Sequence, residues 1–151
     1  MSIRDVHVIL GVDSSAQIAV ELAVRFEAHL TGLSIGEPAE LTDYMDEARA
    51  AVWNGVRAAS IRFNDLLSRR FGRAETIEIQ IADDHNMEPV IDLCRLTDLI
   101  VVGQPSAADR FRKYLLRRLL LDSSAPILVV PATPLTAKFQ TALVAWDGRP
   151  V

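Results

Sequence analysis

Apolar and polar positions change along the chain in blocks that predict strands and helices in turn. Residues 6–12 form an almost unbroken apolar run, which is typical of a strand covered on both faces. Apolar positions from Ile18 to Phe26 then recur at helical spacing, and residues 30–35 form a second short run. A strand, a helix and a strand within about 30 residues have the size of one βαβ unit. We therefore predict a parallel sheet.

The rest of the chain repeats this alternation. Between residues 42 and 71 the apolar positions recur every three or four residues, which predicts one long amphipathic helix. Residues 76–81 alternate apolar with polar side chains, as in a less buried strand. Further periodic blocks predict a helix, a strand, a helix and a strand at residues 87–94, 99–102, 111–121 and 127–130. Five strands and four helices make this an α/β chain, with Asp13, Ser14 and Ser15 as N-cap candidates for the first helix.

The end of the chain repeats the pattern of its beginning. Residues 142–148 have the same order of apolar residues followed by an aspartate as residues 8–14, and the two aspartates lie about one domain length apart. We predict one domain over residues 1–132, a linker at 133–139 and an extra strand at 140–151. Three interpretations of residues 140–151 are open. They are the start of a truncated second repeat, or a strand that pairs with a sheet edge of this chain or of a partner, or an apolar tail that resembles residues 8–14 by chance.

Composition limits the function classes. Of the 151 residues, 50% are hydrophobic and the net charge is −4, which gives no global reason to bind nucleic acid or an anionic membrane. The single cysteine, Cys94, excludes an internal disulfide, as expected of a cytoplasmic protein. The apolar run near the N-terminus is too short for a signal peptide or a membrane span.

Four segments together resemble the universal stress protein family. They follow one another in the family's order and spacing: residues 12–15, 30–35, 98–103 and 124–130. The repeat at residues 143–148 is similar to the start of the second domain in tandem members. The resemblance implies a doubly wound, five-stranded, mostly parallel sheet with helices on both faces, as in adenine nucleotide alpha hydrolase-like folds. It also implies a homodimer formed through the last strands and, in one branch of the family, bound ATP.

The resemblance also places a candidate nucleotide site at the carboxyl ends of the strands, where open parallel sheets bind ligands. In ATP-binding relatives the aspartate after the first strand contacts the nucleoside, and a Gly-x-x-Gly loop followed by Gly-Ser or Gly-Thr surrounds the phosphates. Asp13 matches that aspartate. The candidate contacts are Val12, Asp13, Ser15, Ile35, Gly103, Ser106, Arg112 and Lys113.

The phosphate loop departs from the family pattern. Here it reads Gly103-Gln104-Pro105-Ser106, so that the second glycine is Ser106 and Pro105 has no N–H group. No glycine stands where the later Gly-Ser pair is expected. Since a phosphate cradle needs closely approaching backbone N–H groups, we predict a degenerate loop that does not bind ATP strongly.

Several candidates have two interpretations. Asp13 is a ribose contact or a capping carboxylate, and Ser106 is a phosphate contact or a helix cap. The basic run, Arg110, Arg112, Lys113, Arg117 and Arg118, is an anion site or a solvated helix face, with a subunit contact as a further role for Arg110 and Arg117. We interpret residues 83–85, Asp-Asp-His, as a turn rather than a metal site, and Cys94 as a core thiol.

These patterns predict a non-enzymatic, stress-associated binding or interaction protein without a metal or a catalytic residue. It is expected to form a homodimer or to pair with a second domain, and to bind neither nucleic acid nor membrane. The alternative is a member that binds ATP or another adenine nucleotide, with cations from Arg112 or Lys113. An enzyme is disfavoured, because the sequence shows no phosphate-loop lysine and no carboxylate pair for a metal.

Overall fold

The computed structural model of the chain describes residues 3–36, 45–68, 74–81 and 86–133. Strands and helices alternate along these segments, in the order β1 (Asp5–Ile9), α1 (Asp13–Phe26), β2 (His29–Gly36), α2 (Met45–Ser68), β3 (Ala74–Gln80), α3 (Glu88–Arg95), β4 (Leu99–Gly103), α4 (Arg110–Asp122) and β5 (Ile127–Val130). The predicted alternation of five strands with four helices is confirmed. The predicted extra strand at 140–151 and the turn at 83–85 lie outside the described residues.

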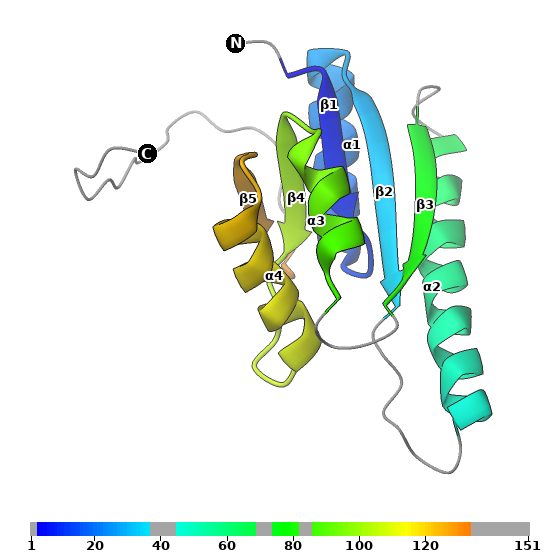
Figure 1. Cartoon of the computed structure of the whole chain (residues 1–151). Helices are drawn as coiled ribbons and strands as arrows, with labels where there is room; N and C mark the ends of the chain where they lie inside the picture. The colour runs from blue at the N-terminus through cyan, green and yellow to red at the C-terminus, as the bar shows by residue number, and fades with distance from the viewer. Residues whose placement is uncertain (1–2, 37–44, 69–73, 82–85, 134–151) are drawn as a thin grey trace.

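The five strands form one parallel sheet in the order β3-β2-β1-β4-β5. Helices α1 and α2 cover one face of the sheet, and α3 and α4 cover the other (Figure 1). The doubly wound fold is therefore confirmed. Strands β3 and β5 are the edges of the sheet. The alternating sequence pattern of β3 predicted a less buried strand, and none of the residues of β3 is buried.

Two apolar cores lie on the two faces of the sheet. Alternate residues of β1 face opposite sides, as a strand requires: Val6 and Val8 pack with α1 and α2, whereas Ile9 packs with α3 and α4. On the first face Phe63 lies directly over Gly32, where a β-carbon would come within 2.4 Å of the ring. The absence of a side chain at Gly32 therefore lets α2 approach β2 closely.

The first predicted strand, residues 6–12, is wrong at its carboxyl end. Strand β1 ends at Ile9, and Gly11 has a φ of 115°, a conformation that residues with a Cβ rarely adopt. The chain therefore turns at Gly11 before α1 begins. The apolar residues on either side of Gly11 hid this turn in the sequence pattern.

The predicted N-cap of α1 is also wrong. Val12 occupies the N-cap position, and the helix has no side-chain cap hydrogen bond. The Ser15 hydroxyl donates instead to the Val12 carbonyl at 2.7 Å, and the Ser14 hydroxyl donates to the Pro131 carbonyl at 2.7 Å. Ser14 thus ties the start of α1 to the end of β5. The acidic residue in the first turn, Asp13, still favours the helix by its charge.

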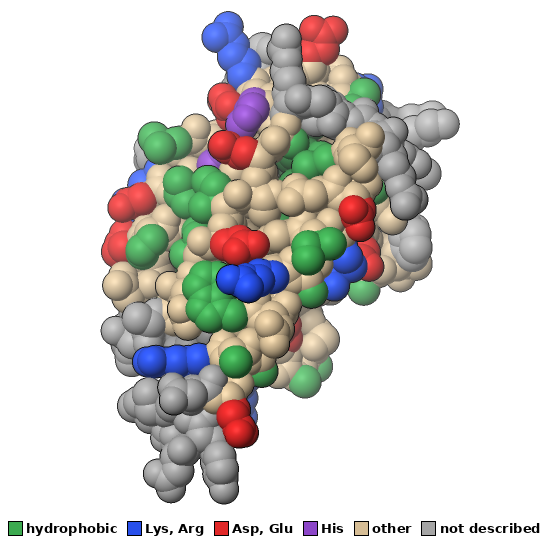
Figure 2. All heavy atoms as spheres, turned by 90° about the vertical axis from the view of Figure 1, so that its right-hand side faces the viewer, with side chains coloured by type: hydrophobic (Ala, Val, Ile, Leu, Met, Phe, Trp, Pro, Cys, Tyr) green, Lys and Arg blue, Asp and Glu red, His purple; other side chains and the backbone are tan. Residues whose placement is uncertain are grey.

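The surface carries both signs of charge. On the side of the molecule that presents β3 and α2, acidic and basic side chains are scattered among apolar ones (Figure 2). Within the described residues no helix is both long and apolar enough to cross a membrane.

Candidate functional site

The candidate site lies at the carboxyl edge of the sheet, where the strand order changes direction. Strand β1 pairs with β2 on one side and with β4 on the other. The chain leaving β1 continues to β2, and the chain leaving β4 continues to β5, so the two connections lead in opposite directions along the sheet. Such a position is the usual ligand crevice of an open parallel sheet. The structure brings four predicted residues to this edge: Val12 and Asp13 after β1, Ile35 near the end of β2, and Gly103 at the end of β4.

A small cavity of about 190 Å³ lies between α1 and α2, next to the end of β1. Its lining includes Val12 and Asp13 from the predicted set and Arg62 from α2. Asp13 Oδ1 lies 3.7 Å from Arg62 Nε, and the two side chains are 80% and 56% exposed. This ion pair is therefore solvated at the mouth of the cavity, where it stabilises the fold only weakly.

A larger cavity of about 430 Å³ adjoins the first and shares Leu10, Gly11, Ala59 and Arg62 with it. It lies between α2 and α4, over the ends of β1 and β2. Ile35 and Arg112 from the predicted set line it. The rest of its described lining is mostly apolar, and includes Val52, Val56, Phe111 and Leu115.

The side chain of Arg112 reaches from α4 to the end of β1. Its Nη2 donates a hydrogen bond to the Leu10 carbonyl at 3.2 Å, and its Nε lies 3.2 Å from Asp109 Oδ2. The guanidinium rests against Gly11, where a β-carbon would lie 1.8 Å from Nη2. The glycine thus provides the space that Arg112 occupies.

The first residues of the phosphate loop after β4 are covered or already hydrogen-bonded. A β-carbon on Gly103 would lie 2.5 Å from the β-carbon of Val12, so the Val12 side chain covers this glycine. The Gln104 N–H donates to the Val130 carbonyl at 2.7 Å, and Pro105 has no N–H. Gly103, Gln104, Pro105 and Ser106 line neither cavity. At Gln104 and Pro105 the loop therefore offers no free backbone N–H group.

Comparison of the sequence with models of protein families and with curated proteins finds no match. Solved structures do match. A universal stress protein in complex with cAMP is 20% identical over 86% of this chain and 98% of its own, with a TM-score of 0.60. A protein of the universal stress protein family from Burkholderia pseudomallei is 19% identical over 84% of this chain and 95% of its own, with a TM-score of 0.62. A universal stress protein from Archaeoglobus fulgidus in complex with dAMP is 14% identical over 85% of this chain and 98% of its own, with a TM-score of 0.56.

The chain has the universal stress protein fold. The resemblance of four short segments had predicted this fold, and the likeness covers most of the described chain. Asp13, Ile35 and Gly103 lie at the carboxyl edge of the sheet in this fold, and their role as ligand contacts stays a prediction.

Four predicted contacts line neither cavity of this universal stress protein fold: Gly103, described above, and Ser15, Lys113 and Ser106. Ser15 is fully buried, with its hydroxyl on the Val12 carbonyl. Lys113 Nζ donates to the Ala107 carbonyl, on the outer side of α4. Ser106 is exposed, and its carbonyl accepts the Asp109 N–H at 3.2 Å.

The interpretation of Ser106 as a helix cap is wrong. Asp109 is the N-cap of α4, and its Oδ1 accepts the Arg112 N–H at 2.9 Å. Asp109 therefore holds both the backbone and the side chain of Arg112. The sequence analysis missed Gly11, Arg62 and Asp109. An aspartate three residues before an arginine at a predicted helix start is the signal that could have identified Asp109.

The basic run on α4 divides into different environments. Arg118 pairs with Asp122 on its own helix and with Glu88 of α3 at 3.6 Å, and its Nη1 donates to the Tyr114 hydroxyl at 3.3 Å. These hydrogen bonds, foremost that with Asp122, raise the pKa of Arg118 above its usual value. Arg118 therefore fastens α4 to α3 rather than serving an anion site.

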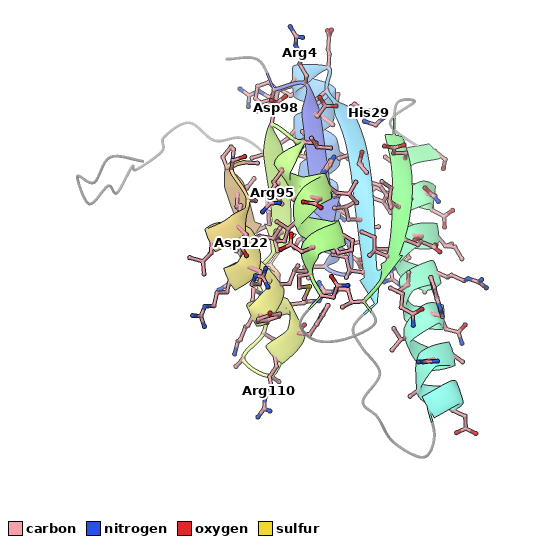
Figure 3. All side chains as sticks on the ribbon, viewed as in Figure 1. Arg4, His29, Arg95, Asp98, Arg110 and Asp122 are labelled. Atoms are coloured by element: carbon pink, nitrogen blue, oxygen red, sulfur yellow. The ribbon has the colours of Figure 1, made fainter. Side chains whose placement is uncertain are left out.

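The α3–α4 contact continues through Arg95 (Figure 3). Arg95 Nη1 lies 2.7 Å from Asp92 Oδ1, and its Nε donates to the Asp122 carbonyl at 3.2 Å.

Arg110 points away from the protein at the other end of α4 (Figure 3). Of the five basic residues, Arg112 is the one that lines a cavity described here.

Cys94 lies in the core between α3 and the sheet, as the sequence predicted. Burial raises the pKa of its thiol to about 12. A thiol that stays protonated is a poor nucleophile. Among the described residues no group of three or more His, Cys, Asp or Glu side chains is placed to hold a metal ion.

Proposed function

We propose that this chain is a stress-associated, non-enzymatic binding protein of the universal stress protein type, which acts in the cytoplasm and does not bind ATP strongly. The phosphate loop is the observation that carries the proposal. Gly103 is covered by Val12, the Gln104 N–H is bonded to Val130, and Pro105 offers no donor. A triphosphate therefore finds fewer backbone N–H donors at these three positions than a Gly-x-x-Gly loop would offer.

The lining of the two cavities supports a role in binding rather than in catalysis. The described residues that line them include neither a histidine nor a cysteine, and their one carboxylate, Asp13, is paired with Arg62. The one hydroxyl among them, on Ser34, donates to the Val56 carbonyl at 2.8 Å. A general base next to a nucleophile would favour an enzyme, and this lining offers no such pair.

Titration calorimetry with Mg-ATP tests the proposal. We expect no saturable heat at millimolar ATP from protein stripped of ligands. Micromolar binding, about −8 kcal/mol, would overturn it, and loss of that binding in Asp13→Ala but not in the control Asp65→Ala would assign it to the site at Asp13. Asp65 is an exposed carboxylate on the same side of the sheet as Asp13 but outside both cavities, so it controls for the change of charge alone.

Binding of an adenine mononucleotide is the second candidate function. The structures that share this fold include one in complex with cAMP and one in complex with dAMP. A single phosphate needs fewer donors than a triphosphate, and Arg112 supplies side-chain donors next to Gly11. Saturable binding of AMP or cAMP, weakened in Arg112→Gln, would favour this candidate over a cleft that rejects nucleotides.

We also propose that the chain forms a homodimer through β5, with pairing to a second domain as the alternative. Strand β5 is an edge of the sheet, and Val129 on it is 40% exposed. Leu120 and Leu121, just before it, are 61% and 70% exposed. An uncovered edge with apolar neighbours is a ready surface for twofold pairing.

Light scattering of Val129→Lys tests this interface. A dimer in the wild type that becomes a monomer in the variant is the expected result, because the lysine places a charge at the edge. Ile61→Lys, at a 61% exposed apolar position on α2, is the matched control. A dimer that is unchanged in Val129→Lys would exclude β5 as the interface.

A further inference from the structure

The larger cavity has a charge pattern that distinguishes it from an ordinary apolar crevice. Among the described residues that line its volume of about 430 Å³, the charged side chains are Arg62 and Arg112, both cationic. Arg62 lies near a carboxylate, Asp13, at the mouth and is more than half exposed. Arg112 is only 26% exposed, and part of its charge is offset by the Asp109 carboxylate, whose Oδ2 lies 3.2 Å from Nε.

Arg112 is held in place before any ligand arrives. Asp109 contacts its Nε and accepts its backbone N–H, and the Leu10 carbonyl accepts from Nη2. A guanidinium has five N–H donors in a fixed plane. These side-chain contacts use two of them, so three donors are left for a ligand. A preorganised fork of this kind suits the two oxygens of a carboxylate.

The other described residues that line the cavity are mostly apolar. Val52 and Val56 of α2 stand on one side, and Phe111 and Leu115 of α4 stand on the other. Ser34 lies among them with its hydroxyl already bonded to Val56. Burial of an apolar body between these walls is favourable, whereas a ligand with many polar groups finds few side-chain partners among the described lining residues.

We propose that this cavity binds a small aliphatic or aromatic monocarboxylate, with its carboxylate on the Arg112 guanidinium and its apolar body between α2 and α4. The inference rests on the proposed function in one respect, that the cleft is not filled by a strongly bound nucleotide. The Arg112 N–H donors that Asp109 and Leu10 leave unused, together with the apolar residues of α2 and α4, match one carboxylate on an apolar body. They match the several charges of a nucleoside triphosphate poorly.

Calorimetric titration with sodium octanoate and with octan-1-ol tests the proposal, since the two ligands share an apolar chain and differ in charge. We expect one-to-one binding of octanoate, at least about tenfold tighter than octan-1-ol. Arg112→Gln should weaken octanoate by about tenfold and leave octan-1-ol unchanged. The matched control is Arg110→Gln on the same helix, because Arg110 points away from the protein (Figure 3).

A second variant keeps the test decisive if Arg112→Gln folds poorly. Gly55 lines the cavity, and a β-carbon built there has no heavy atom within 4 Å. Gly55→Leu is therefore expected to fold, to fill part of the cavity and to weaken octanoate and octan-1-ol alike. Equal affinity for the two ligands in the wild type, or octanoate binding unchanged in both variants, would overturn the proposal.

The outcome is separable from that of the proposed function. Tight binding of Mg-ATP to the wild type would overturn the function proposed above, whatever octanoate does. Loss of the difference between octanoate and octan-1-ol would overturn the monocarboxylate site even if ATP does not bind.

Discussion

The guanidinium of Arg112 lies against Gly11, so that a methyl group on this glycine would sit 1.8 Å from Nη2. The contact joins the start of α4 to the end of β1 at the switch point of the sheet. It depends on two properties of one glycine, since Gly11 both leaves this space and adopts a φ of 115°.

Gly11→Ala should therefore destabilise the protein by about 1–3 kcal/mol, the usual range for a strained backbone conformation. Urea unfolding of Gly11→Ala, Arg112→Ala and the double variant separates the two causes. If the clash with Arg112 dominates, the double variant recovers most of the loss. If the φ angle dominates, the effects of the single variants add.

Asp109→Ala should cost about 1 kcal/mol, because it removes the N-cap of α4. It should also free the Arg112 side chain, whose Nε it contacts. Asp109→Ser is the matched variant, since serine keeps a capping oxygen without the charge. Stability restored in Asp109→Ser while octanoate binding stays weakened would separate capping from the positioning of Arg112. A stability equal to that of the wild type in Asp109→Ala would contradict the capping role.

Ser14→Ala should cost about 1 kcal/mol, because the buried hydroxyl donates to the Pro131 carbonyl and leaves that acceptor without this partner. Thermal unfolding measures the loss. Ser68→Ala, an exposed serine at the end of α2, is the control. A melting temperature lowered equally in both variants would show that the link between α1 and β5 contributes nothing specific.

Asp98 should make stability depend on acid pH. It accepts the N–H groups of Arg4 at 2.7 Å and of Asp5 at 3.2 Å, and these hydrogen bonds lower its pKa. The ionised form is thus favoured in the folded state, so its contribution is present at neutral pH. It is lost as the pH falls below the usual aspartate value toward the lowered one.

Urea unfolding of Asp98→Asn from pH 7 to pH 3 checks this expectation. The variant should be less stable than the wild type at pH 7, and the difference should shrink as the pH falls. Asp65→Asn, at an exposed position on α2, is the control. A difference that stays constant over this range would contradict the role of the Asp98 charge.

His7 should also make the protein less stable as the pH falls, but in a higher pH range than Asp98. Burial on β1 lowers its pKa, against the opposing charges of Asp5 and Glu75, and its Nδ1 has no hydrogen-bond partner among the described residues. Below about pH 6.5 the unfolded chain takes up a proton that the folded chain resists. Stability therefore falls as the pH falls through this range.

His7→Leu should remove this loss and leave stability at pH 7.5 unchanged or higher, because it replaces an unpaired buried nitrogen with an apolar group. The free energy of unfolding at pH 7.5 and pH 5.5 is the measurement. His29→Gln, at a 43% exposed histidine at the start of β2, is the control. A variant that loses as much stability as the wild type between these pH values would contradict this role of His7.

Much of the fold could be predicted from the sequence, because periodicity records which side of an element is buried. The strand at 127–130 and the helix at 87–94 appear in the structure within one residue of their predicted bounds. The likeness of four ordered segments to universal stress proteins gave the doubly wound sheet. The missing loop glycines are visible in the sequence, and the weak phosphate site that they predict stays a prediction.

The tertiary structure decided the chemistry of the site. Arg112 and Arg118 lie on one helix and look alike in the sequence, yet one lines the cavity and the other binds Glu88 and Asp122. Which way a cation points depends on what packs around its helix, and that depends on contacts between residues about 100 positions apart, such as Arg112 with Leu10. Local sequence determines periodicity and chain turns, whereas only packing brings distant groups to one cavity.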